Sequence, residues 1–221
     1  MKMFLMVLIF FAAVQSANAG LVVRVNFGAD GVVSDNGVGD LNPLTGVIEA
    51  NFSSAQFDVL VGVAQSTQNL GSNTINLSVT YSATGVEGLT SIAVSDSNLT
   101  GYSQSIYSHT DGNLGSGVSQ YWRTSLDELN RDFAIGSAGL LILGPLTGTQ
   151  SAHGSLTGFT QANPFSMGGS LRLVSIGGNS GTVGSANASV STVPEPNSLV
   201  IIASLFGGVS LCHRRRHTRL R

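Results

Sequence analysis

Apolar and polar residues alternate along much of this chain, in short segments separated by Gly, Asn, Ser and Asp. Residues 73–81 are the clearest case, with Ile75, Leu77, Val79 and Tyr81 on one face and Thr, Asn and Ser on the other. A period of two is typical of β-strands that are buried on one face. We therefore expect a strand here.

The same alternation predicts further strands over residues 21–27, 47–52, 56–63, 89–94, 101–107, 140–143, 154–160, 170–176 and 182–191. In residues 56–63, the apolar face would hold Phe57, Val59, Val61 and Val63. Short half-buried strands at this spacing indicate an all-β domain, an antiparallel β-sandwich or a jelly-roll-like fold. We assign this ectodomain to residues 20–192, with residues 192–196 as the linker that follows it.

One segment has helical rather than strand spacing. Ser125 to Glu128 match a capping box, and Leu126, Leu129 and Phe133 recur at i, i+3 and i+7. Asp127 and Arg131 form an i,i+4 pair on the other side of such a helix. The sequence thus predicts one short helix packed over the sandwich.

Residues 1–19 have the composition of a secretory signal peptide. Lys2 supplies the positive start, residues 4–14 the apolar core, and Ala17-Asn18-Ala19 a small-x-small cleavage site. The apolar run is too short for a transmembrane helix. We expect signal peptidase to cleave after Ala19, which makes Gly20 the first residue of the mature chain.

The end of the chain, residues 193–221, has three parts. The first is the motif Val193, Pro194, Glu195 and Pro196, which two prolines make extended and rigid. The second is an apolar helix of about residues 198–212. Its 14 residues from 199 to 212 would be roughly 21 Å long and so a marginal span of a hydrocarbon core of about 30 Å. The third is the basic end, residues 213–221, with Arg214, Arg215 and Arg216, which favours the cytoplasmic side.

In order and position, these three parts resemble the sorting tail of the PEP-CTERM family of exported bacterial proteins. The resemblance implies processing near the motif by an exosortase, an integral-membrane cysteine transpeptidase. It also implies an inner-membrane intermediate that becomes a cell-surface or extracellular protein. Such tails also carry the label of an ice-binding protein C-terminus, which is no evidence of ice binding. A simple, permanent C-terminal membrane anchor is the alternative.

Charge and cysteine usage exclude several classes of function. Residues 20–192 contain four arginines, no lysine and eleven acidic residues, so their net charge is −7. This argues against a nucleic-acid partner, since such binding depends on neutralising phosphates. The chain's one cysteine, Cys212, lies in the tail, so the ectodomain has no disulfide.

Two groups of residues suggest ligands. Tyr102, Tyr107, Tyr121 and Trp122 flank His109, Asp111 and Asn113, a composition that suits a sugar-binding patch. The alternative is that Tyr121 and Trp122 belong to the core under the helix. The loop of residues 30–42 gathers Asp30, Asp35, Asn36, Asp40 and Asn42, whose oxygens suit calcium. Its spacing matches neither an EF-hand nor an RTX pattern, and Asp, Asn and Gly are the commonest turn formers, so a plain solvated loop is the favoured interpretation.

Catalytic patterns are weak. Asp127 and Glu128 are adjacent carboxylates, but the capping box already accounts for Glu128. His109 and His153 are distant in sequence, and neither a nucleophile elbow, a phosphate loop nor a metal motif occurs, so we expect no cofactor.

We therefore expect an exported, non-catalytic surface or matrix protein of an exopolysaccharide-producing bacterium. Its processing partners would be signal peptidase and exosortase. The alternative is a carbohydrate-binding module, calcium-assisted in one version, with extracellular polysaccharide as its partner. A polysaccharide-degrading enzyme is a third possibility.

Overall fold

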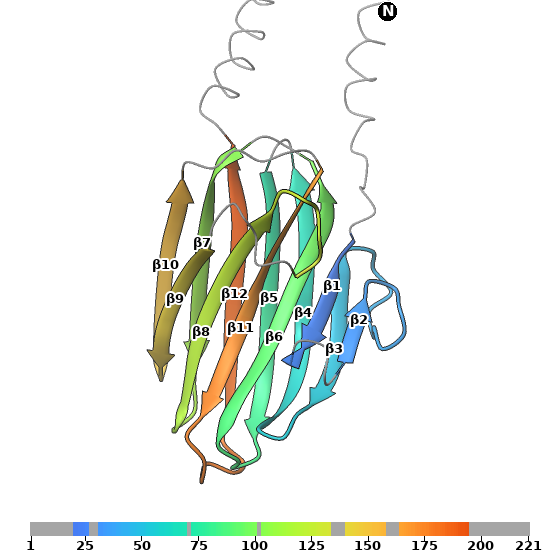
Figure 1. Ribbon diagram of the computed structural model, residues 1–221. Coiled ribbons are helices and arrows are strands. Elements are labelled where there is room, and N and C mark those ends of the chain that lie inside the picture. Colours follow the sequence, from blue (N-terminus) through green and yellow to red (C-terminus); the bar gives the residue numbers. More distant parts are fainter. Residues whose placement is uncertain are drawn as a thin grey trace, which may run out of the picture.

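The computed structural model describes residues 20–26, 31–69, 72–100, 103–133, 140–157 and 164–194 (Figure 1). The expected signal peptide, Tyr102, Glu195, Pro196 and the rest of the tail with Arg214, Arg215 and Arg216 lie outside the described residues. Within the described part of the chain, no helix is long and apolar enough to cross a membrane.

The domain consists of two antiparallel six-stranded sheets, which confirms the prediction of an all-β sandwich. Sheet A has the order β2-β1-β6-β11-β8-β9. Its strands are β1 (Val22–Val25), β2 (Gly31–Ser34), β6 (Gly88–Leu99), β8 (Val118–Asp127), β9 (Leu140–Thr147) and β11 (Phe165–Ser175). Sheet B has the order β10-β7-β12-β5-β4-β3. Its strands are β3 (Val47–Ser53), β4 (Phe57–Asn69), β5 (Ser72–Ala83), β7 (Ser103–Asn113), β10 (Thr149–Thr157) and β12 (Val183–Pro194).

Consecutive strands from β5 to β12 alternate between the two sheets, except for β8 and β9, which are neighbours in sheet A. Figure 1 shows the result, with sheet A in front of sheet B. This winding brings together strands that are far apart in sequence. In sheet B, for example, β12 pairs with β5 on one side and β7 on the other.

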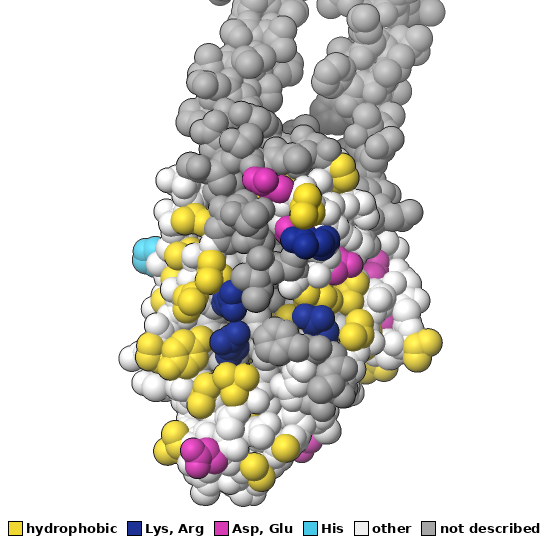
Figure 2. Space-filling view, in the orientation of Figure 1, with side chains coloured by type: hydrophobic (Ala, Val, Ile, Leu, Met, Phe, Trp, Pro, Cys, Tyr) yellow, Lys and Arg dark blue, Asp and Glu magenta, His cyan; other side chains and the backbone are white. Residues whose placement is uncertain are grey.

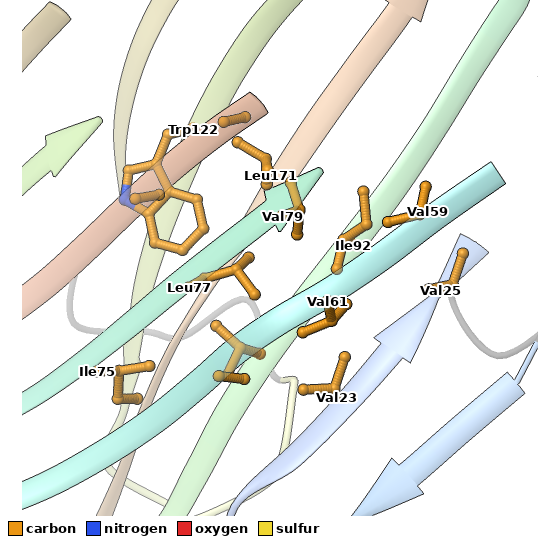
Figure 3. Close-up of a cluster of buried hydrophobic side chains, with 14 of the residues drawn as sticks. Val23, Val25, Val59, Val61, Ile75, Leu77, Val79, Ile92, Trp122 and Leu171 are labelled. Carbon is orange, nitrogen blue, oxygen red and sulfur yellow. The ribbon is translucent and has the colours of Figure 1, made fainter. Parts of the chain in front are cut away.

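The core lies between the sheets and is built from the inward positions of every strand that alternates cleanly. On β5, Ile75, Leu77, Val79 and Tyr81 are all at most 3% exposed, so the predicted apolar face is confirmed. Figure 3 shows Val79 of β5 near Leu171 and Ile92 of sheet A, inside a cluster that also contains Ile75 and Leu77. Burial of such side chains, at roughly 1.5–3 kcal/mol each, is the main force that holds the sheets together.

The predicted helix over residues 125–133 is wrong, because residues 118–127 form strand β8. Leu126 is buried as the last inward residue of this strand rather than as part of a helical stripe. The Asp127 carboxylate accepts hydrogen bonds from the backbone N–H and the guanidinium of Arg131. It therefore holds a turn, in which Asn130 and Phe133 have positive φ, and Leu129 is exposed.

Two other details differ from the sequence-based expectations. A β-bulge between Val61 and Val63 turns Val63 outward, to 39% exposure, and Ala64 takes the next buried position. Strand β12 continues through Val193 and Pro194, which pair with Ser105 and Ser103 of β7. The first half of the tail motif thus belongs to sheet B, not to a linker.

Candidate functional site

The described aromatic residues of the expected sugar-binding patch lie in three different places. Trp122 is fully buried, and its indole N–H donates to Ser108 Oγ at 2.8 Å. Tyr121 is partly exposed on the outer face of sheet A, and Tyr107 is 41% exposed on the outer face of sheet B. The structure therefore does not unite these residues. Trp122 is part of the core, as the alternative proposed, although under no helix.

Tyr107 remains the centre of a smaller site, because the polar residues that follow it share its face. Tyr107, His109, Asp111 and Asn113 are successive outward positions of β7. On the adjacent β10, His153 stacks beside Tyr107 with a centroid distance of 6.3 Å and an interplanar angle of 25°. We call the outward surface of β10, β7 and β12 around these residues the Tyr107 face.

A hydrogen-bond network crosses the Tyr107 face. Asn187 of β12 donates to Asp111 Oδ1 at 2.8 Å and accepts from Ser78 of β5 at 2.8 Å. The other carboxylate oxygen of Asp111 lies 3.6 Å from His109 Nδ1. These bonds fix an exposed carboxylate and an amide beside an aromatic pair.

The outer face of sheet B is also hollowed. A shallow depression of about 620 Å³ crosses β3, β4, β5 and β12 and ends at Asn113 on β7. Its lining contains short hydroxyl and amide side chains together with Leu60 and Val183. Such a surface can accept an extended ligand that offers hydroxyl groups and apolar ring faces.

Sequence reasoning missed two members of this site. His153 was considered far from His109, yet the two are direct register partners on β10 and β7. Asn187 is not among the residues that the sequence suggests for a sugar-binding patch, yet its partner across the strands is Asp111. Neither proximity can be read from the sequence, since both depend on which strands become neighbours in sheet B.

The loop expected to offer calcium ligands is organised by its own carboxylates. Strand β2 occupies residues 31–34, and Asp30 lies outside the described residues. Asp35 accepts the backbone N–H of Gly46, while Asp40 accepts those of Asn36, Asn42 and Glu49. Within the described residues, no three His, Cys, Asp or Glu side chains are grouped as metal ligands would be. The Asp and Asn residues thus act as turn formers.

This arrangement predicts that Asp40→Ala lowers the free energy of unfolding by about 1–2 kcal/mol, because three backbone N–H groups lose their acceptor. The loss should be the same with and without millimolar calcium, and calcium should leave the melting temperature of the unmodified chain unchanged. Urea and thermal unfolding measure both. A calcium-dependent rise in melting temperature that Asp35→Ala abolishes would instead establish a calcium site.

The adjacent carboxylates Asp127 and Glu128 are not a catalytic pair in this geometry. Asp127 is 1% exposed, and two of its bonds from the Arg131 guanidinium are 3.0 Å long. The side-chain hydrogen bond from Arg131 holds the pKa of Asp127 below its usual range, despite burial. This carboxylate is therefore a charged, structural group of the turn.

Comparison with known proteins gives only distant likenesses. No protein-family model and no curated protein matches the chain. The adhesin domain of Epf from Streptococcus pyogenes is 9% identical over 78% of this chain and 57% of its own, with a TM-score of 0.40. The enzymatically active domain of bacteriophage CBA120 tailspike protein 4 is 8% identical over 63% of this chain, which spans 20% of it, with a TM-score of 0.36. The module TmCBM61, solved with β-1,4-galactotriose, is 11% identical over 71% of this chain and 92% of its own, with a TM-score of 0.33. At these TM-scores, none of them carries information about the function of this chain.

Proposed function

We propose that this chain is a bacterial protein exported through a PEP-CTERM-type tail, and that its jelly-roll β-sandwich serves a non-catalytic structural or binding role at the cell surface or in the extracellular matrix. The continuity of β12 with the motif supports this proposal. Thr192 is buried, and Val193 and Pro194 still pair with β7. The described sandwich therefore reaches into the motif, so that a folded domain adjoins the segment that an exosortase would process.

The alternation of β5–β12 between the sheets is the winding of a jelly roll and supports that part of the proposal. The non-catalytic role is supported by Asp127, whose carboxylate is buried and bonded to Arg131. An apolar segment that is short for a bilayer supports a processed tail rather than a permanent anchor.

In an exosortase-positive host, the mature chain is expected to end within residues 193–196 and to lack peptides from residues 214–221. The double substitution Glu195→Ala/Pro196→Ala should leave uncleaved protein in the membrane fraction, because it alters the motif but spares the paired residues of β12. Mass spectrometry of the purified surface protein measures the C-terminus. Substitution of Val183, an exposed residue at the other end of β12, by threonine is the control and should be processed normally. Intact arginine-rich C-terminal peptides on surface protein would favour the permanent anchor.

Glycan binding at the Tyr107 face is the second candidate function, and one observation favours it. An exposed aromatic pair and a hydrogen-bonded carboxylate–amide network lie side by side on the outer face of sheet B, and a depression on the same face reaches Asn113 of β7. Sugar rings stack on aromatic faces, while carboxylate and amide groups bind sugar hydroxyls. An uncharged polysaccharide is the matching ligand class, since the Tyr107 face carries an acidic residue but no arginine or lysine.

Tyr107→Ala is expected to weaken binding to a neutral polysaccharide about tenfold, which corresponds to about 1.4 kcal/mol of lost stacking. Affinity electrophoresis in gels that contain neutral glucans, galactans or mannans measures the change. Ile176→Ala is the control, because it removes an exposed apolar side chain just after β11 of the opposite sheet, away from both candidate sites. If no neutral polymer retards the protein, or if both variants lose the same amount of affinity, the proposal of glycan binding is wrong. The structural role would then remain.

A further inference from the structure

The arginines of the sandwich are unevenly distributed. Residues 20–194 contain four arginines and no lysine, and Arg131 is paired with Asp127. The other three, Arg24 of β1, Arg123 of β8 and Arg172 of β11, are outward residues of sheet A. Figure 2 shows positive side chains gathered on this face of an otherwise acidic domain.

Strand register brings the three arginines around a floor of small residues. Arg24 pairs with Ala93, Ala93 with Ser170, and Ser170 with Arg123, so two arginines stand at the ends of one row. Arg172 lies in the next row, where its partner on β6 is Ser91. The Ser91 and Ser170 hydroxyls are hydrogen-bonded at 2.7 Å. Between the long side chains lies a hollow of about 40 Å³ that all three arginines line. We call this the arginine hollow.

The guanidinium groups of Arg123 and Arg172 are incompletely bonded. Arg24 lies over the Phe133 ring at 4.1 Å, which orients it. The Nε atoms of Arg123 and Arg172 are buried and have no hydrogen-bond partner among the described residues. Neither residue takes part in an ion pair of the described part of the chain. Buried donors without acceptors and neighbouring like charges are both unfavourable, and one anion would relieve both.

We propose that the arginine hollow binds carboxylate groups of an acidic, uronate-containing polysaccharide. A carboxylate is planar and accepts two parallel bonds from a guanidinium, and the hollow has room for one such group. Tyr121, the register partner of Arg172, and Ile142, that of Arg123, lie on the same outer face and are partly or largely exposed. They offer apolar surface to a sugar ring. This site is independent of the Tyr107 face, which lies on the opposite sheet.

The test is binding of the full chain, purified in detergent, to alginate as a uronate polymer, with dextran and dextran sulfate as neutral and sulfated comparisons. Alginate should bind, and raised salt should weaken it because screening shortens the range of the charges. Arg123→Gln/Arg172→Gln should weaken binding at least tenfold, and Arg123→Lys/Arg172→Lys by less, since lysine keeps the charge but not the planar fork.

The matched control is Asn76→Asp/Asn51→Asp, which changes the net charge by the same amount at two exposed positions on the outer face of sheet B. It should bind alginate almost as the unmodified chain does. If alginate binding is weakened equally in both double variants, it depends on the net charge of the protein and the proposed site is wrong. The absence of alginate binding at low salt, or binding of dextran sulfate alone, would also contradict the site. Thermal melts confirm that each variant is folded.

A separate observation concerns Gly20, the residue that would follow the signal peptide. Its backbone N–H, together with that of Ser97 and the Ser66 hydroxyl, donates to the carboxylate of Asp96, which is fully buried. The charged group that acts on Asp96 is the carboxylate of Asp132, and Asp96 Oδ1 has no hydrogen-bond partner among the described residues. Asp96 is therefore a buried acid that forms no ion pair with a positively charged group of the described residues.

We also infer that cleavage after Ala19 creates that missing charge, because the Gly20 amide becomes an α-ammonium group beside the Asp96 carboxylate. The released N-terminus would then form an ion pair at the end of β6, so that the sandwich gains stability only when the signal peptide has been removed. This inference rests on the export proposal for the position of the cleavage.

Two chains test the ion pair, one that begins at Gly20 and one with a short neutral peptide joined to Gly20. The first should melt at a higher temperature at pH 7, and Asp96→Asn should abolish the difference. N-terminal sequencing of the protein from its host tests the cleavage site separately. Cleavage at another position would contradict the predicted signal-peptide cleavage site. Cleavage before Gly20, together with equal melting temperatures of the two chains, would contradict the ion pair alone.

Discussion

Trp122→Ala is expected to lower the free energy of unfolding by about 3–5 kcal/mol, the range for removing a large aromatic side chain from a core. Trp122 is fully buried, and its N–H bond to Ser108 joins β8 of sheet A to β7 of sheet B. Its ring also fits against Gly169 so closely that a Cβ on that residue would overlap it. Urea unfolding monitored by circular dichroism measures the loss.

Two variants sharpen this test of the core. Trp122→Phe should cost less than the alanine variant, since it keeps most of the apolar volume and Ser108 still donates to the Ser189 carbonyl. Tyr121→Ala, one residue away on the outer face, should cost less than about 1 kcal/mol. If Trp122→Ala lowers the free energy of unfolding by less than about 1 kcal/mol, the ring does not belong to the core. Trp122 would then again be a candidate for ligand contact.

Alternation predicted strands well where the inward positions are apolar. On β5 and β12, every second residue is buried and nearly all of these are Ile, Leu, Val, Ala or Tyr. A shift of one residue would bury their Ser, Thr and Asn side chains instead, so burial on one face fixes the register. The strand assignment there needs no tertiary information.

Strand β8 could not be recognised in this way, because two of its inward residues are polar. Gln120 is buried and donates to Thr110 and to the Asp111 carbonyl of β7. Thr124 is buried beside the Leu141 carbonyl of β9. Partners on other strands bind the Gln120 amide N–H groups and the Thr124 hydroxyl, which lowers the cost that normally keeps polar groups out of a core, although Gln120 Oε1 has no hydrogen-bond partner among the described residues. The capping-box spacing then suggested a helix where Asp127 stabilises a turn.

The candidate sites also combine residues that the sequence pattern places together with residues that only the strand order brings near. Tyr107, His109, Asp111 and Asn113 lie two residues apart, so a single strand is enough to place them on one face. His153 and Asn187 join them only because β10 and β12 flank β7, an order that arises from crossings between the sheets. The arginine hollow likewise combines residues from β1, β8 and β11, which no local pattern connects.

Asp96→Asn is expected to raise the free energy of unfolding at pH 7 by up to about 3 kcal/mol in a chain whose Gly20 is joined to a preceding residue. Burial, the largest cause, together with the Asp132 charge, raises the pKa of Asp96 from 3.8 to about 6, although hydrogen bonds from Ser66 and backbone N–H groups oppose the shift. The folded state therefore binds a proton at Asp96 more tightly than the unfolded state does. A difference of about two pKa units corresponds to about 3 kcal/mol.

The sign of this effect sets the pH window in which to measure it. The stabilising effect of the bound proton is fully present below pH 3.8, the unfolded value, and is lost as the pH rises through about 6. Asparagine keeps an uncharged side chain in place at all pH values, so Asp96→Asn should match the unmodified chain below about pH 4 and exceed it at pH 7. Asp58→Asn, at an exposed position of β4, is the control and should show no such divergence. Parallel stability curves for Asp96→Asn and the unmodified chain from pH 4 to 7 would show that folding does not raise the pKa of Asp96, despite its burial.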